Sequence, residues 1–175
     1  MRTAKWQNYF DNLANNSYDK QMPNNLFTMN VKLGKWTRLG SSRGNILGLS
    51  AKSTSEMVQR LEAGFHFNAL IRFHKVSGLP MATISDFVQI PPRTLARRKT
   101  ARRLRPEESE RLLRIAELFE KALRLFEGDV AAARSWLTRP NKALGHEPPI
   151  AYARTEVGAR EVEDLVDRLE HGVFS

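Results

Sequence analysis

The sequence of 175 residues contains no cysteine. Disulfides, iron–sulfur clusters and thiolate zinc sites are therefore excluded, and the composition fits a reducing compartment. No run of apolar residues approaches the ~20 that span a membrane, and the first thirty residues lack the continuous apolar stretch of a secretion signal. From these absences we expect a cytoplasmic protein with no membrane contact.

Sequence patterns typical of catalytic sites are missing as well. The four histidines form no His-Glu-x-x-His zinc motif, because His146-Glu147 is followed by two prolines that prevent the helix this motif needs. No Gly-x-Ser-x-Gly segment is present. The stretch RLGSSRGNILGLS, residues 38–50, resembles a phosphate-binding loop but lacks its Gly-Lys-Ser/Thr ending. We therefore expect no enzymatic activity, no metal and no cofactor, and we interpret 38–50 as a flexible connector.

Acidic residues are scarce in the first part of the chain. Residues 1–105 hold 18 Lys or Arg against 5 Asp or Glu, whereas residues 106–175 hold 10 against 14. A basic half suits a polyanion such as nucleic acid, because Lys and Arg release counterions from phosphates when they bind. An acidic half favours a different partner. With 41% hydrophobic residues, the chain has enough apolar material for one large domain or two small ones.

The middle of the chain is expected to form four short helices, of which the last is strongly basic. Gly64 and Gly78 are typical of helix C-termini, and Pro92 suits the first turn of a helix, where its missing N–H costs nothing. The last two helices would be joined by a turn of three residues, which is the outline of a helix-turn-helix. The segments that hold the four helices are TSEMVQRLEAG, FNALIRFHKVSG, LPMATISDFVQI and PPRTLARRKTARR.

The spacing of apolar residues supports this outline. Ile84 and Val88 would face inward from the first helix of the pair, Ile90 would fill the turn, and Leu95 would anchor the second helix. The match has two weak points. Gln89 stands where a glycine is common, and Pro91 offers no capping oxygen.

The basic helix presents its charges away from this apolar contact. At about 100° per residue, Arg93 and Arg97 lie about 160° from Leu95. In a helix-turn-helix this outer face meets base edges in the major groove, and the flanking cations meet phosphates. An RNA-binding helix or a solvated basic face is the alternative. The predicted DNA-binding residues are Arg93, Thr94, Arg97, Arg98, Lys99, Thr100, Arg102 and Arg103.

The second half is also expected to be helical. A long helix would begin at Pro106, with acidic residues in its first turn that complement the helix dipole. Its apolar stripe is wide enough to require cover on more than one side. Asp129 and Thr155 are expected to cap two further helices, and the proline-rich segment between them is expected to be a turn-rich crossing. The expected fold class is therefore all-α.

Three segments together resemble the toxin-binding domain of the Xre/MbcA/ParS antitoxins, the partners of RES-domain toxins. These segments are RLRPEESERLLRIAELFEKAL, WLTRPNKALG and TEVGAREVEDLVDRLEHGVFS, and the preceding ISDFVQIPPRTLARRK resembles the helix-turn-helix of the same family. The resemblance covers about residues 54–175. It implies an N-terminal extension at 1–53, an Xre-like helix-turn-helix domain at 54–105 and a toxin-binding domain at 106–175.

The resemblance also implies two functions. The C-terminal domain would bind and cover the active site of a RES toxin that degrades NAD or transfers its ADP-ribose. The helix-turn-helix domain, usually as a dimer, would bind the operator of its own operon and repress it, and a larger hetero-oligomer with the toxin is compatible with this. A stand-alone transcriptional regulator, with a C-terminal domain that only dimerises or binds an effector, is the alternative. The predicted toxin-binding residues are Glu170, His171, Gly172, Val173, Phe174 and Ser175.

Overall fold

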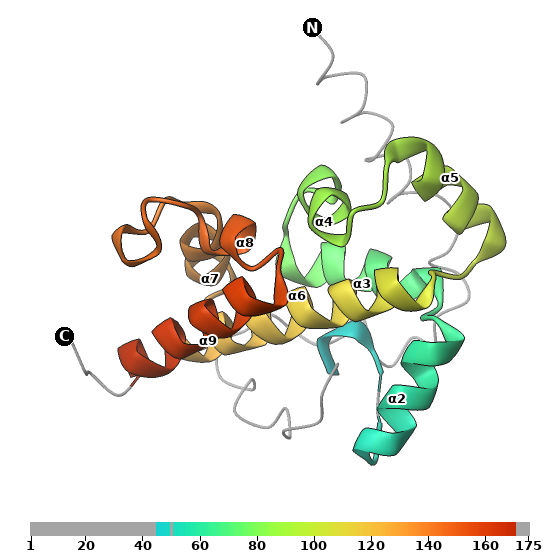
Figure 1. Cartoon of the computed structure of the whole chain (residues 1–175), viewed down its shortest axis with the longest axis horizontal. Helices are drawn as coiled ribbons and strands as arrows, with labels where there is room; N and C mark the ends of the chain where they lie inside the picture. Colours follow the sequence, from blue (N-terminus) through green and yellow to red (C-terminus); the bar gives the residue numbers. More distant parts are fainter. Residues whose placement is uncertain (1–44, 50, 171–175) are drawn as a thin grey trace, which may run out of the picture. The chain divides into compact units, whose positions relative to one another are not determined.

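The computed structural model describes residues 45–49 and 51–170, and this part of the chain is helical without a β-strand. The predicted all-α fold is confirmed. The described residues all belong to one compact unit (Figure 1). The elements, in chain order, are the 3-10 turn η4 (Asn45–Leu47), the helices α2 (Thr54–Ala63), α3 (Phe67–Ser77), α4 (Met81–Val88), α5 (Pro92–Ala101), α6 (Pro106–Leu125) and α7 (Val130–Thr138), the 3-10 turn η5 (Lys142–Leu144), and the helices α8 (Pro149–Tyr152) and α9 (Glu156–Glu170).

Side-chain caps fix where several of these helices begin. The Ser53 hydroxyl accepts the Glu56 N–H at 3.1 Å at the start of α2. Asp129 Oδ1 accepts the N–H groups of Ala131 and Ala132 at 2.8 and 2.9 Å at the start of α7. The Thr155 hydroxyl accepts an N–H of the first turn of α9 at 3.0 Å. Each bond satisfies a backbone donor that the helix itself leaves unpaired, so the predicted caps at residues 129 and 155 are confirmed.

Helices α4 and α5 form the predicted helix-turn-helix. They are separated by residues 89–91, and Ile84, Val88, Ile90 and Leu95 are all at most 2% exposed. Gln89 adopts the left-handed conformation, with φ of 59°, that a glycine supplies more easily. The sharp turn forms despite this unfavourable residue, with four buried apolar side chains around it and a hydrogen bond of 2.8 Å from the Ile90 N–H to the Ser85 carbonyl.

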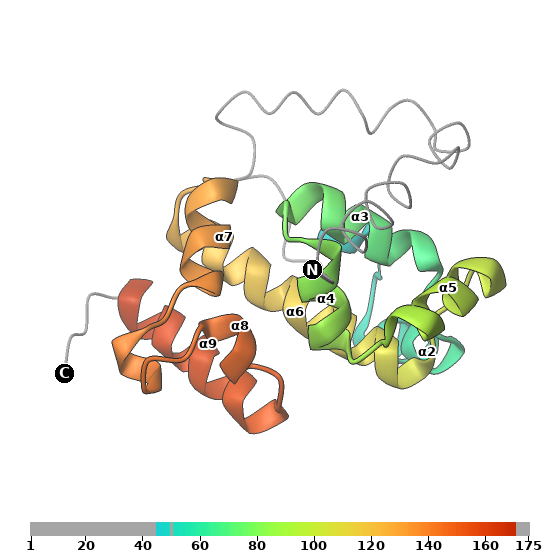
Figure 2. The same ribbon diagram turned by 90° about the horizontal axis from the view of Figure 1, so that it is seen from above.

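The 20-residue helix α6 is the common core element of the described chain. It contacts α2, α3 and α4 of the helix-turn-helix half, and it contacts α7 and α9 of the other half (Figure 2). The rings of Phe73 on α3 and Phe119 on α6 meet edge to face, with centroids 5.9 Å apart. Because other helices pack on two sides of α6, its apolar stripe has to be wide. The buried apolar residues of α6 are Leu112, Leu113, Ile115, Ala116, Leu118, Phe119, Ala122 and Leu123.

The prediction of a flexible connector at 38–50 is wrong for the turn η4. Ile46 and Leu47 are each only 3% exposed and pack against α3 and α6. The Ile46 N–H donates to Glu120 Oε1 at 2.9 Å, and the Ile46 carbonyl accepts from Arg72 Nε at 3.3 Å. Two buried side chains and two hydrogen bonds to distant helices make this short turn a part of the core.

The segments after α6 build the C-terminal half. Helix α9 lies along α6, and α8 contacts both α7 and α9 (Figures 1 and 2). Gly158, in the first turn of α9, faces the Tyr152 carbonyl so closely that an added Cβ would lie 2.0 Å from its oxygen. In the crossing segment, Asn141 Oδ1 accepts the Ala143 N–H at 3.0 Å, and Leu144 is buried. The missing side chain at position 158 therefore sets the close approach of α8 and α9.

Candidate DNA-binding and toxin-binding surfaces

Helix α5 presents two of its predicted base-reading arginines to solvent. Arg93 and Arg97 are exposed, and Thr94 between them is half-buried. Within residues 45–49 and 51–170, the structure gives neither arginine a hydrogen bond or an ion pair. Two guanidinium groups one helical turn apart are therefore available for contacts outside the described chain.

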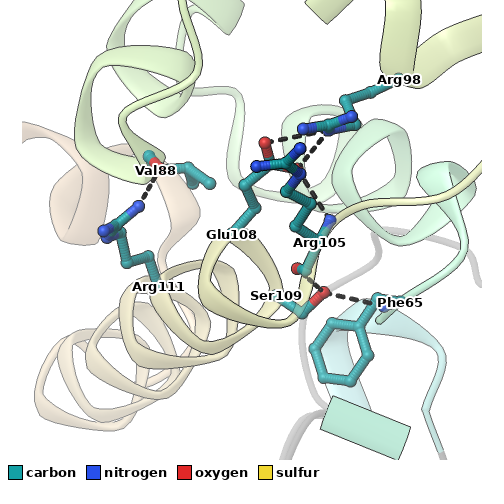
Figure 3. A network of polar contacts seen from close by, with 7 residues as sticks. All are labelled: Phe65, Val88, Arg98, Arg105, Glu108, Ser109 and Arg111. Carbon is teal, nitrogen blue, oxygen red and sulfur yellow. Dashed lines mark hydrogen bonds and ion pairs between the residues drawn. The ribbon is translucent and has the colours of Figure 1, made fainter. Parts of the chain in front are cut away.

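Arg98 differs from its predicted place on the flank of the DNA-binding surface. It is 9% exposed, and its Nε lies 2.9 and 2.7 Å from Oε1 and Oε2 of Glu108 on α6 (Figure 3). A guanidinium that is buried and paired in this way holds α5 against α6 instead of meeting a phosphate. We therefore correct the predicted set by removing Arg98.

The other predicted residues lie at the C-terminal end of α5. Arg102 ends the helix in the left-handed conformation, with φ of 55°, and its side chain is exposed. Arg103 Nη1 donates to the carbonyls of Ala63 and Gly64, at 2.8 and 3.3 Å, so it also closes the end of α2. The exposed Thr100 donates its hydroxyl to a backbone carbonyl of its own helix at 3.3 Å, and Lys99 is half-buried.

The chain on either side of α5 is fixed to the body by backbone and side-chain bonds. Beyond α5, the Leu104 N–H donates to the Phe65 carbonyl at 2.9 Å. Ser109 on α6 accepts the Phe65 N–H and donates to the Arg105 carbonyl, both at 2.8 Å (Figure 3). Before α5, Arg111 Nη1 donates to the Val88 carbonyl at 3.2 Å. Residues 109–111 of α6 therefore hold the chain before and after α5.

Sequence reasoning missed this supporting role of the first turns of α6. The only signal was the pair of acidic residues after Pro106, which we interpreted as complements of the helix dipole. Glu108 also accepts the Arg105 N–H through Oε2 at 2.8 Å, so one carboxylate both caps α6 and pairs with α5.

Of the predicted toxin-binding residues, the structure describes only Glu170. It is the last residue of α9, and it is exposed. His171, Gly172, Val173, Phe174 and Ser175 lie outside the described residues.

Ion pairs fix α9 along α6. Arg114 lies 2.8 Å from Glu156 at the start of α9, and Lys121 lies 3.0 Å from Glu163 and 3.5 Å from Asp167 near its end. Burial lowers the pKa of Lys121, but the hydrogen bonds and charges of Glu163 and Asp167 raise it by more, so its net shift is upward. The ion pairs of Arg114 and Lys121 therefore set the position of α9 on α6.

Two features of the described chain bear on other classes of function. In residues 45–49 and 51–170, His, Asp and Glu side chains form no cluster of three that would hold a metal ion. A search of the same residues finds no helix with the length and hydropathy of a membrane span.

Two family models match the chain on either side of residue 120. The antitoxin Xre-like helix-turn-helix domain matches residues 56–117, and the antitoxin Xre/MbcA/ParS C-terminal toxin-binding domain matches residues 121–172. The first match spans α2 to α5 and more than half of α6, and the second begins within α6. Both family matches therefore include part of helix α6.

Curated relatives agree with these matches. Antitoxin Xre of Yersinia enterocolitica is 42% identical over 130 residues, which are 74% of this chain and 88% of that protein. Antitoxin Xre of Photorhabdus laumondii is 33% identical over 129 residues, which are 65% of this chain and 84% of that protein. Proteins of this kind are antitoxins and not enzymes. With a helix-turn-helix and a toxin-binding domain in the family's order, the chain belongs to the Xre antitoxin family.

Proposed function

We propose that this antitoxin binds the operator of its own operon through α5 and represses it. The observation that supports this most directly is the exposed pair Arg93 and Arg97 on the second helix of a well-packed helix-turn-helix. Arginine forms paired hydrogen bonds with guanine in the major groove. Thr94, Lys99, Thr100, Arg102 and Arg103 complete the proposed DNA-binding set. An operator of two half-sites would be bound by a homodimer.

We further propose that the toxin partner is a RES-domain protein that consumes NAD or transfers its ADP-ribose. The basis is the resemblance of three sequence segments to antitoxins of such toxins. As the resemblance implies, Glu170 and the residues that follow it, His171, Gly172, Val173, Phe174 and Ser175, would cover the toxin's active site. The match to a toxin-binding domain favours this function over a stand-alone regulator. Antitoxin and toxin would meet in the cytoplasm, where the dimer would assemble into a larger complex and associate with the nucleoid at the operator.

Operator binding is tested with Arg93→Ala and Lys99→Ala in a mobility-shift titration. The probes are a duplex from upstream of the antitoxin's own coding sequence and a random duplex of equal length. A base contact at Arg93 should cost ~1–3 kcal/mol on the first duplex and little on the second. Loss of a phosphate contact at Lys99 should weaken both alike. Equal losses on both duplexes for Arg93→Ala would reduce that residue to a phosphate contact.

Occlusion by the tail is tested by deleting residues 172–175. The truncated antitoxin should still form a complex with its proposed RES toxin, because α9 and the rest of the domain remain. NAD turnover by the purified complex should be partly restored, and size-exclusion chromatography should show that the partners remain together. A truncated complex that is intact and still inactive would assign inhibition to the body of the domain.

A further inference from the structure

Three arginines of residues 106–175 contact helix α4 or the turn that leads into it. They come from three separate elements, since Arg111 lies on α6, Arg134 on α7 and Arg154 between α8 and α9. None of them belongs to the helix-turn-helix, yet each contacts the first helix of that motif or the turn before it.

Arg111 holds the C-terminal end of α4. Its Nη1 donates to the carbonyl of Val88, the last residue of α4, at 3.2 Å (Figure 3). Carbonyls at a helix C-terminus have no partner within the helix, and a cation there also interacts favourably with the helix dipole. The contact therefore fixes the point where the chain leaves α4 for the turn to α5.

Arg134 holds the turn that leads into α4. Its Nη1 donates to the Gly78 carbonyl at 3.2 Å. Gly78 ends α3 in the left-handed conformation, and an added Cβ there would lie only 2.5 Å from the same nitrogen. The turn and the guanidinium are thus in direct contact.

Arg154 pairs with Asp86 on the exposed side of α4. The two side chains are 44% and 69% exposed, so the pair adds little to the free energy of unfolding. Through this pair the guanidinium of Arg154 lies against Asp86, the one acidic residue of α4, which stands three residues before the turn to α5.

We propose that Arg111, Arg134 and Arg154 are positioning residues for DNA recognition, which act on α5 through α4. The proposal rests on the proposed operator binding. Only three residues separate α4 from α5, and within this turn the N–H groups of Gln89 and Ile90 donate to carbonyls of α4 at 3.1 and 2.8 Å, so a displacement of α4 moves the start of α5 with it. Hydrogen bonds to bases weaken steeply with distance and angle, whereas attraction to phosphates does not. Disturbed positioning therefore lowers operator binding more than non-specific binding.

The experiment measures the ratio of affinities for the upstream duplex and a random duplex of equal length, with the full chain. The variants are Arg111→Met, Arg134→Met and Arg154→Asp, and circular dichroism melts accompany them. Arg139→Met is the matched control, because it removes the same charge from an exposed site of the same half with no contact to α4 among the side-chain bonds of the described residues. The combination of Asp86→Arg with Arg154→Asp tests whether the pair acts through its own contact.

Arg111→Met should lower the affinity ratio about fivefold or more, as expected for the loss of one charged hydrogen bond. Arg134→Met should act in the same direction. Arg154→Asp, which sets two carboxylates against each other, should lower the ratio, and the swapped pair should recover at least half of that loss on a logarithmic scale. Arg139→Met should leave the ratio unchanged. For all variants the dependence of non-specific binding on salt should keep its slope.

Three outcomes would overturn the inference. Ratios equal to that of the wild type in all three variants would show that α4 needs no support from these arginines. A swapped pair no better than Arg154→Asp, or a salt slope reduced by about one in that variant, would make Arg154 a direct phosphate contact. A wild-type chain without preference for the upstream duplex would instead refute the proposed operator binding, and this inference with it.

Discussion

The helix-turn-helix half and the toxin-binding half differ in charge but share their packing. Residues 1–105 are strongly basic and residues 106–175 are acidic, which suits two different partners. Yet α6 is buried by helices of both halves, and the two family models meet inside it. The charge on the surface of a region reflects the partner that the region binds. The extent of a hydrophobic core depends instead on which helices pack against one another. A change in charge along a chain therefore need not coincide with a boundary between folding units.

The largest effect should come from cutting the chain where the charge changes. The change of sign alone favours a self-sufficient fragment 106–175, but this fragment would expose the side of α6 that α2, α3 and α4 cover. We expect it to lose its cooperative unfolding transition, as followed by circular dichroism. Residues 45–175, which keep η4 and all partners of α6, should unfold in one transition. A cooperative melt of the shorter fragment would show that the toxin-binding half has a core of its own.

The next largest effect should come from the buried ion pair between α5 and α6. Glu108→Ala leaves the buried Arg98 without its partner and should lower the free energy of unfolding by about 3–5 kcal/mol. Replacing both residues, as Arg98→Met with Glu108→Leu, should cost far less, because no charge remains buried. Urea denaturation at pH 7 measures both. Equal losses in the single and the double variant would mean that packing, and not the unpaired charge, accounts for the effect.

Gly158→Ala sharpens the comparison by acting on the toxin-binding half alone. The added methyl group would collide with the Tyr152 carbonyl, and α9 would have to move away from α8. We expect a loss of about 1–3 kcal/mol in the free energy of unfolding, measured by urea denaturation, because overpacking costs this much. Val157→Ala is the control, since it changes the neighbouring position of α9, where the side chain is 77% exposed. A loss in Gly158→Ala no larger than that of this control would refute the steric explanation.

The smallest effect concerns the contact of η4 with α6. Burial raises the pKa of Glu120, and this outweighs the hydrogen bond from Ile46 and the nearby Arg124, which lower it. A carboxyl whose pKa is raised on folding destabilises the folded state as pH rises from about 4 toward neutrality. Glu120→Gln keeps an oxygen acceptor for the Ile46 N–H and loses this charge. It should raise the free energy of unfolding at pH 7 by under about 1 kcal/mol, with the gain disappearing near pH 4. A gain that persists at pH 4 would contradict this origin.

The helix-turn-helix was predictable because its apolar residues follow a local period. Ile84, Val88, Ile90 and Leu95 lie within twelve residues, so the spacing alone places them on facing sides. The inward position of Arg98 was also predictable, because a residue three positions after Leu95 lies only about 60° from it on a helix. The density of basic residues around it obscured that position.

The turn η4 could not be predicted in the same way. Its partner Glu120 is 74 residues away, and a pair of apolar residues in a stretch rich in Gly, Ser and Asn has no helical period. The contacts of Arg111, Arg134 and Arg154 with α4 and the turn before it join residues that are 23, 56 and 68 positions apart. Such contacts depend on tertiary packing, which no local pattern records.

The shared helix α6 would give the proposed operator binding and the toxin binding of this antitoxin a common lifetime. If residues 45–170 unfold as one cooperative unit, as predicted above, an event that opens the helix-turn-helix also exposes the buried side of the helix on which α9 rests. Release of the operator and release of the toxin would then be one step, so the operon would be expressed in the same instant that its toxin becomes free. A heat pulse or a protease would need to unfold only one structure to produce both signals, and no partly active antitoxin would persist between them.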